Sequence, residues 1–143
     1  MRRMRLAATL TCACLFSAAD AGTIAITDGW FRALPAGLPA AGYFKLHNGG
    51  DRPVLLKAAD SSACETLMIH RSMSTGGMEH MMPAGDLEVA PGGTLVFAPN
   101  GYHLMCLQPT PAMTPGAIVT VTLQFADGGA VTSDFTVRGA AGN

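Results

Sequence analysis

The chain has almost no helix-forming pattern. Beyond residue 21, no stretch longer than ten residues places apolar side chains at helical spacing without a glycine or proline interrupting it. No apolar run reaches the roughly 20 residues that a transmembrane helix needs. Charged residues make up 13% of the chain and the formal net charge is −1, so no basic excess marks a surface for nucleic acid. These absences argue against a helical fold, a membrane span and nucleic-acid binding.

The sequence also shows no convincing set of catalytic residues. No pair of side chains forms a convincing nucleophile and base, because the closeness of Ser72 to His70 and His80 in the sequence is a common accident of composition. We therefore expect a protein that is not an enzyme.

The first 21 residues have the form of a secretory signal peptide. A basic start and an apolar stretch are followed by Ala19-Asp20-Ala21, which has the small-x-small form of a cleavage site. We expect cleavage near Ala21, export to the periplasm and a mature chain, residues 22–143, that forms one domain. A lipid anchor at Cys12 or Cys14 is the alternative, although the residues before these cysteines are a poor context for lipoprotein processing.

Two cysteines, Cys64 and Cys106, remain after cleavage, in a compartment where thiols are normally oxidised. We expect a disulfide between them. Strand alternation raises an objection, because regular strands would put Cys64 on the face of His70 and Cys106 on the face opposite His103. A bulge or an irregular strand start near residues 61–63 would remove it. Otherwise Cys106 is a free thiol, available as an extra soft metal ligand.

Short β-type runs separated by turn residues fill the mature chain. Their near-regular spacing predicts a single-domain Greek-key β-sandwich rather than a parallel sheet, which would need crossover helices. The expected strands cover residues 23–31, 41–47, 53–59, 64–70, 86–89, 94–98, 102–107, 118–125 and 130–138. The expected core residues, which pack without further function, are Trp30, Tyr43, Phe97, Leu104, Leu123 and Phe125.

Methionine is over-represented, and its placement indicates chemistry. Thioether sulfur is a soft ligand that competes poorly for Zn(II) but well for Cu(I), whereas imidazole binds either class of metal. A mixed set therefore points to copper, mainly in its reduced state. Filling of an apolar core, the usual role of methionine, fits poorly, because residues 71–80 are polar and predict a solvated loop. Five methionines and two histidines lie within fifteen residues: Met68, Met73, Met78, Met81 and Met82, with His70 and His80.

Four potential ligands have a definite spacing. Ten residues separate His70 from Met81, twenty-one separate Met81 from His103, and one separates His103 from Met105. His103 and Met105 are two apart in a strand and so project on the same face, and we expect the loop to return Met81 to His70 at the end of a strand. Four neutral ligands would hold Cu(I) in an open, exchangeable site that suits delivery. Two neighbours of Met81 are candidate auxiliary ligands: Met78 and His80.

With this spacing the sequence resembles the periplasmic copper chaperones of the PCuAC family, whose signature is the same His, Met, His, Met order. The resemblance implies a cupredoxin-like Greek-key fold, Cu(I) binding and delivery of copper for cytochrome c oxidase assembly, in some members with a Sco-type thiol protein as partner. It covers most of the mature chain and includes Trp30-Phe31-Arg32 before a proline-rich loop, Gly42-Tyr43-Phe44, Met81-Met82-Pro83 and Pro99-Asn100-Gly101-Tyr102-His103-Leu104-Met105.

Two other functions remain open. A cupredoxin-type electron-transfer protein would share the fold, but its site needs two histidines and a cysteine thiolate with a weak axial ligand. Neither Cys64 nor Cys106 stands in the order that such sites use. A metal-free exported β-sandwich acting as an interaction module would bind no copper above the background of any methionine-containing protein.

Overall fold

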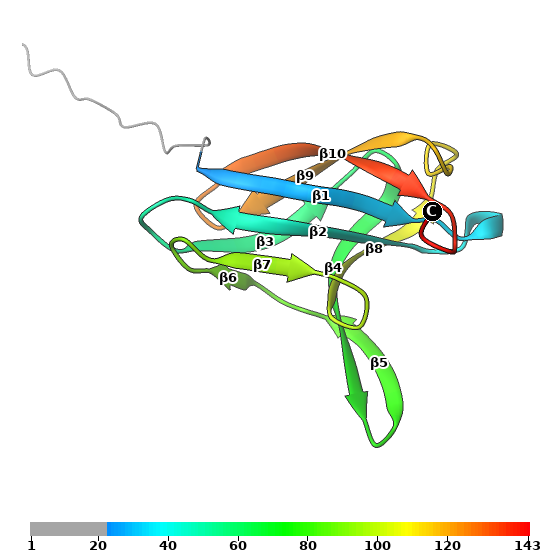
Figure 1. Cartoon of the computed structure of the whole chain (residues 1–143), viewed down its shortest axis with the longest axis horizontal. Helices are drawn as coiled ribbons and strands as arrows, with labels where there is room; N and C mark the ends of the chain where they lie inside the picture. The colour runs from blue at the N-terminus through cyan, green and yellow to red at the C-terminus, as the bar shows by residue number, and fades with distance from the viewer. Residues whose placement is uncertain (1–22) are drawn as a thin grey trace, which may run out of the picture.

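The computed structural model describes residues 23–143 and is built almost entirely of β-strands, which confirms the all-β prediction (Figure 1). The expected signal peptide, with Cys12 and Cys14, lies outside these residues. No helix in the described part of the chain is long and apolar enough to cross a membrane. The elements are β1 (Ile24–Arg32), the 3-10 turn η1 (Pro35–Gly37), β2 (Ala40–Asn48), β3 (Val54–Asp60), β4 (Cys64–Thr75), β5 (Met78–Pro83), β6 (Leu87–Val89), β7 (Thr94–Phe97), β8 (Tyr102–Pro109), β9 (Ile118–Phe125) and β10 (Ala130–Arg138).

The strands of the described chain form one continuously hydrogen-bonded sheet. Their order is β5-β4-β8-β7-β2-β1-β10-β9-β3-β6, and β8 also pairs with β2. All pairings are antiparallel except β1 with β10 and the single residue pair between β7 and β8. Several neighbours, such as β4 and β8, are far apart in the sequence, as long Greek-key connections require.

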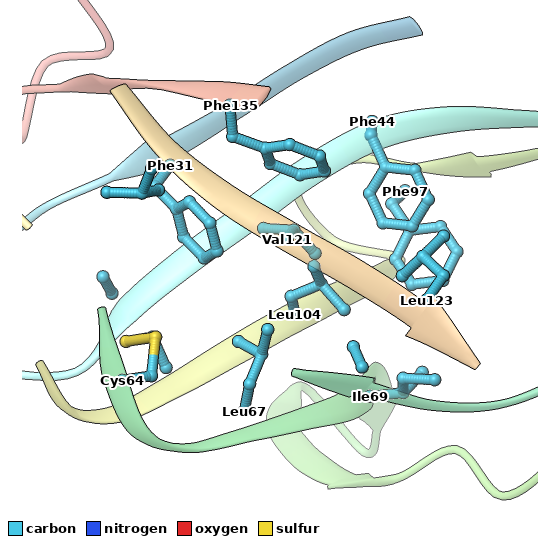
Figure 2. Close-up of a cluster of buried hydrophobic side chains, with 14 of the residues drawn as sticks. Phe31, Phe44, Cys64, Leu67, Ile69, Phe97, Leu104, Val121, Leu123 and Phe135 are labelled. Atoms are coloured by element: carbon cyan, nitrogen blue, oxygen red, sulfur yellow. A yellow bond between two sulfur atoms is a disulfide. The ribbon is translucent and has the colours of Figure 1, made fainter. Parts of the chain in front are cut away.

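One apolar core fills the inside of this curved sheet. It draws buried side chains from strands near both ends of the order, and β3 and β4 contact each other although many strands separate them in that order. The sheet therefore curls around its own inner face. Figure 2 shows Phe31 and Phe135 on one side of the cluster and Leu67 and Ile69 on the other. Burying each such side chain contributes roughly 1.5–3 kcal/mol.

Two aromatic residues that we expected in the core lie on the outer face instead. Trp30 and Tyr43 are sequence neighbours of the core residues Phe31 and Phe44, and strand alternation turns them outward. Their rings stack with centroids 4.9 Å apart, and Arg32 donates a hydrogen bond of 3.1 Å to the Tyr43 hydroxyl. Tyr43 is only 4% exposed, so its expected burial is confirmed, but it lies outside the main apolar cluster. The other expected residues do belong to the core: Phe97, Leu104, Leu123 and Phe125.

The methionine-rich segment forms a β-hairpin, so the predicted loop is wrong. β4 continues past His70 to Thr75, and β5 returns alongside it. Gly76 and Gly77 join the two strands with φ of 61° and 80°, the positive values that a two-residue hairpin turn requires. Figure 1 shows this hairpin projecting from the body of the molecule. Every residue of β5 is exposed, as the polar composition predicts.

Cys64 and Cys106 form a disulfide with Cα atoms 5.4 Å apart, inside the usual range for such bonds. Both cysteines are buried in the core. The objection from strand alternation fails because two successive residues of β4, Glu65 and Thr66, are both exposed, which returns Cys64 to the buried face. In β8, Gln108 has a φ of 48°. The irregularity therefore lies within the paired strands and not at residues 61–63, where we expected it.

Candidate metal site

Three neighbouring strands, β5, β4 and β8, place the four predicted ligands on one face of the sheet. His70 in β4 lies directly opposite His103 in β8, and side chains of directly opposed residues interact on the same face. Met105 follows His103 by two positions and so shares that face. Met81 in β5 lies opposite Ser72, which follows His70 by two positions in β4. We call this side of the three strands the front face.

The two histidines form a close pair. Their ring centroids are 5.8 Å apart and the ring planes are inclined at 75°. His103 is only 3% exposed, and its Nδ1 lies 3.2 Å from the carbonyl oxygen of Gly101. Since a carbonyl oxygen only accepts, this hydrogen bond puts the imidazole proton on Nδ1 and leaves the lone pair on Nε2. The backbone thus orients His103 as it does many metal-binding histidines.

Three buried imidazole nitrogens have no hydrogen-bond partner: Nδ1 and Nε2 of His70, and Nε2 of His103. A buried polar atom left unpaired costs about 1–3 kcal/mol, so native proteins rarely keep several together. Burial and the neighbouring His103 lower the pKa of His70, which favours the neutral ring that binds metals. A neutral imidazole has one lone pair and one N–H group. A soft cation that accepts one lone pair from each ring would therefore remove most of this cost, so the residues present fit a metal.

The two thioethers lie on opposite sides of the histidine pair. Met105 is half-buried in β8, whereas Met81 on the projecting hairpin is 63% exposed. Met81 and His103 line an open surface pocket of about 280 Å³ together with Arg32 and Tyr43. Burial raises the pKa of Tyr43, so its hydroxyl stays protonated in the wall of this pocket. Met81 is the accessible member of the set.

A third sulfur, which is a fifth potential donor, lies on the front face and was not among the four predicted ligands. Met68 is directly opposite Met105 and precedes His70 by two positions, so both are on the same side of β4. The signal that could have found it is this spacing of two, which also relates His103 to Met105. The predicted auxiliary ligands lie elsewhere. Alternation along β5 separates them from Met81 and turns them to the reverse face of the hairpin: Met78 and His80.

Comparison with solved structures defines the class of the fold. The copper-bound PCuAC domain from PmoF2 matches with a TM-score of 0.67 and 25% identity, over 82% of this chain and 94% of that one. The Cu(I) form of DR1885 from Deinococcus radiodurans matches with a TM-score of 0.62 and 27% identity, over 77% and 74% of the two chains. The protein is a PCuAC-type domain with a cupredoxin-like β fold, as the sequence motifs predict.

The sequence comparisons give the family. The model of the family described as "Putative lipoprotein LpqE-like" matches residues 24–137, and the chain belongs to that family. One curated relative, "Putative lipoprotein Lxx21020" from Leifsonia xyli subsp. xyli (strain CTCB07), is 30% identical over 110 residues. The match covers 76% of this chain and 66% of the length of that relative.

Proposed function

We propose that this protein is an exported copper chaperone that binds Cu(I) through His70, Met81, His103 and Met105. The observation that supports this most is the group of three buried imidazole nitrogens without hydrogen-bond partners, on the face that also carries the two thioethers. Soft, neutral donors of this kind favour Cu(I) over the harder divalent ions. The copper-bound state of two similar PCuAC structures agrees with this chemistry.

Delivery is the second part of the proposal. The four ligands are neutral, so the bound site keeps the charge of the ion, and the exposed thioether of Met81 leaves one side of the site open to an acceptor. We propose that the acceptors are the copper centres of cytochrome c oxidase or their assembly factors, including a Sco-type thiol protein. A thiolate acceptor is chemically suitable, because Cu(I) binds thiolate more strongly than thioether.

The proposed location is the periplasm, reached through the signal peptide of residues 1–21. The family description and the curated relative are both lipoprotein names, which agrees with export and keeps the anchor at Cys12 or Cys14 as the alternative. Intact mass of the native protein and partition into detergent distinguish the two forms. Cleavage near Ala21 gives an unmodified aqueous protein, whereas acylation gives a detergent-soluble one.

The electron-transfer alternative has less support. Both cysteines of the described chain are in the disulfide, and their side chains belong to the inner core. No thiolate in the described residues therefore faces His70 and His103, as a blue copper site would need. A strong blue absorption after addition of Cu(II) to the oxidised protein would reverse this ranking.

The test is a competition titration at half an equivalent of Cu(I), with a coloured Cu(I) chelator, so that only the tightest site fills. We expect His103→Ala to weaken binding by a factor of ten or more, since Nε2 is a direct ligand in the proposal. The matched control is His47→Ala, an exposed histidine in β2 whose Nδ1 lies 3.0 Å from Thr94 Oγ1. X-ray absorption should count two nitrogen and two sulfur neighbours. Equal affinity of the two variants would refute the front-face assignment.

A further inference from the structure

The reverse face of the β4–β5 hairpin carries a second group of soft donors. Met73 in β4 lies directly opposite His80 in β5. Met78 and Met82 flank His80 at two positions on either side and so share its face. Met81 alternates with them and points to the front face. We call Met73, Met78, His80 and Met82 the reverse-face cluster.

These methionines do not pack in a core. Met73, Met78 and Met82 are 39%, 65% and 46% exposed, and no strand of the described chain pairs with β5 on its outer side. Gathering exposed apolar side chains on an edge strand is a liability, which soluble proteins normally avoid with charged residues. A ligand role explains why thioethers occupy these positions, and the imidazole of His80 among them favours a soft metal ion over a protein partner.

The register allows three of the donors to converge. Directly opposed residues have Cβ atoms roughly 4.5–5.5 Å apart, and diagonal neighbours roughly 7–8 Å, gaps that the flexible methionine side chain can close. Met78 and Met82 are about 13 Å apart along β5, so one ion cannot bind both. Met82 is the less exposed of the two, so we take it as the ligand. Arg71, opposite Met82, turns away toward Tyr102 of β8, with its guanidinium 5.4 Å from the ring centroid.

We propose that Met73, His80 and Met82 form a second Cu(I) site on the reverse face of the hairpin. The inference extends the proposed function, since it takes Cu(I) to be the cargo, but its ligands are separate from those of the front face. With one imidazole and exposed ligand side chains it binds more weakly than the front site, which holds two imidazoles with buried nitrogens. The hairpin thus carries copper on both faces, with β5 supplying ligands to each.

The test counts Cu(I) equivalents by chelator competition on the mature protein and on three variants. The reverse-face variant is Met73→Leu/His80→Gln/Met82→Leu, and the front-face variant is His103→Ala/Met105→Leu. Met113→Leu, a buried methionine far from the hairpin in the sequence, controls for loss of a thioether with little change in volume. We expect the native chain and the control to bind two equivalents. The reverse-face variant should lose only the weaker one, and the front-face variant only the tighter one.

The outcomes separate the two proposals. The second site is overturned if the reverse-face variant still binds two equivalents. It is also overturned if the native chain binds only one equivalent at the lowest chelator concentration, a result that leaves a protein-docking role for these methionines. A front-face variant that keeps the tighter equivalent overturns the proposed function. Methyl NMR with Ag(I), a diamagnetic substitute for Cu(I), gives an independent reading. The Met73 and Met82 methyl signals should move only with the second equivalent.

Discussion

Removal of the Cys64–Cys106 disulfide should weaken the fold and spare the metal site. The bond closes a loop with a sequence separation of 42. The chain-entropy relation for a loop of that length gives a stabilisation of about 4 kcal/mol at 25 °C, with 2–4 kcal/mol typical of measured cases. A chain of this size has roughly 5–15 kcal/mol of total stability, so the loss is a large share of it.

The same substitution should change Cu(I) affinity by less than a factor of ten. Cys106 is in the inner core, whereas His103 and Met105 alternate with Leu104 and Cys106 and so face outward. The assay is urea unfolding of Cys64→Ala/Cys106→Ala beside the native protein, followed by chelator competition on both. Unchanged stability would mean that the cross-link is absent. A loss of affinity beyond a hundredfold would mean that Cys106 is a ligand, and the orientation argued from β8 would be refuted.

Four further predictions address the site and the sheet. Met105→Leu conserves volume and should alter stability by less than about 1.5 kcal/mol, yet weaken Cu(I) binding at least tenfold; unchanged affinity by competition would remove Met105 from the site. Cu(I) affinity should fall as the pH drops below about 6.5, the ordinary histidine value, because protons compete for the same nitrogens. The lowered pKa of His70 means that this ring is protonated only at lower pH, so the affinity falls most steeply below pH 6.5. An affinity that stays constant from pH 7.5 to 5 would show that His70 and His103 are not both ligands. The copper-free protein should lose stability over the same fall in pH, because His70 binds a proton at a higher pH in the unfolded chain than in the folded protein. Gly42→Ala should destabilise the fold by about 1–3 kcal/mol, because the added Cβ would lie 2.6 Å from Phe31 Cε1 and 3.1 Å from Leu104 Cβ; a melting temperature equal to that of the native protein would contradict this packing.

Most strands were predictable from local pattern because each buries one face. Alternation in β9 and β10, with glycines between them, is enough to define that hairpin. The β4–β5 hairpin was missed for the opposite reason. Both of its faces meet solvent, so its polar residues carry no alternation, and Gly76 and Gly77 are equally typical of a loop.

The sequence predicts those members of the candidate site that are related by spacing along the chain. It does not predict the members that are related only by the pairing of strands. The spacing from His70 to Met105 identifies residues that the structure brings to one face. Sequence proximity made Met78 and His80 appear to be partners of Met81, but neighbours in a strand point to opposite faces. Met68 was left unassigned because its relation to Met105 exists only through the pairing of β4 with β8.

The projecting hairpin allows the metal preference of the protein to change with little effect on the stability of the fold. Since β5 is exposed throughout, exchanging its side chains removes little of the burial that stabilises the molecule. Mutation can therefore replace a thioether by a carboxylate or an imidazole and shift the preference toward harder ions, while the curled sheet beneath is unaffected. A scaffold arranged in this way lends itself to engineering of new selectivities, with Gly76 and Gly77 as the only positions on the hairpin whose backbone conformation restricts what can be substituted.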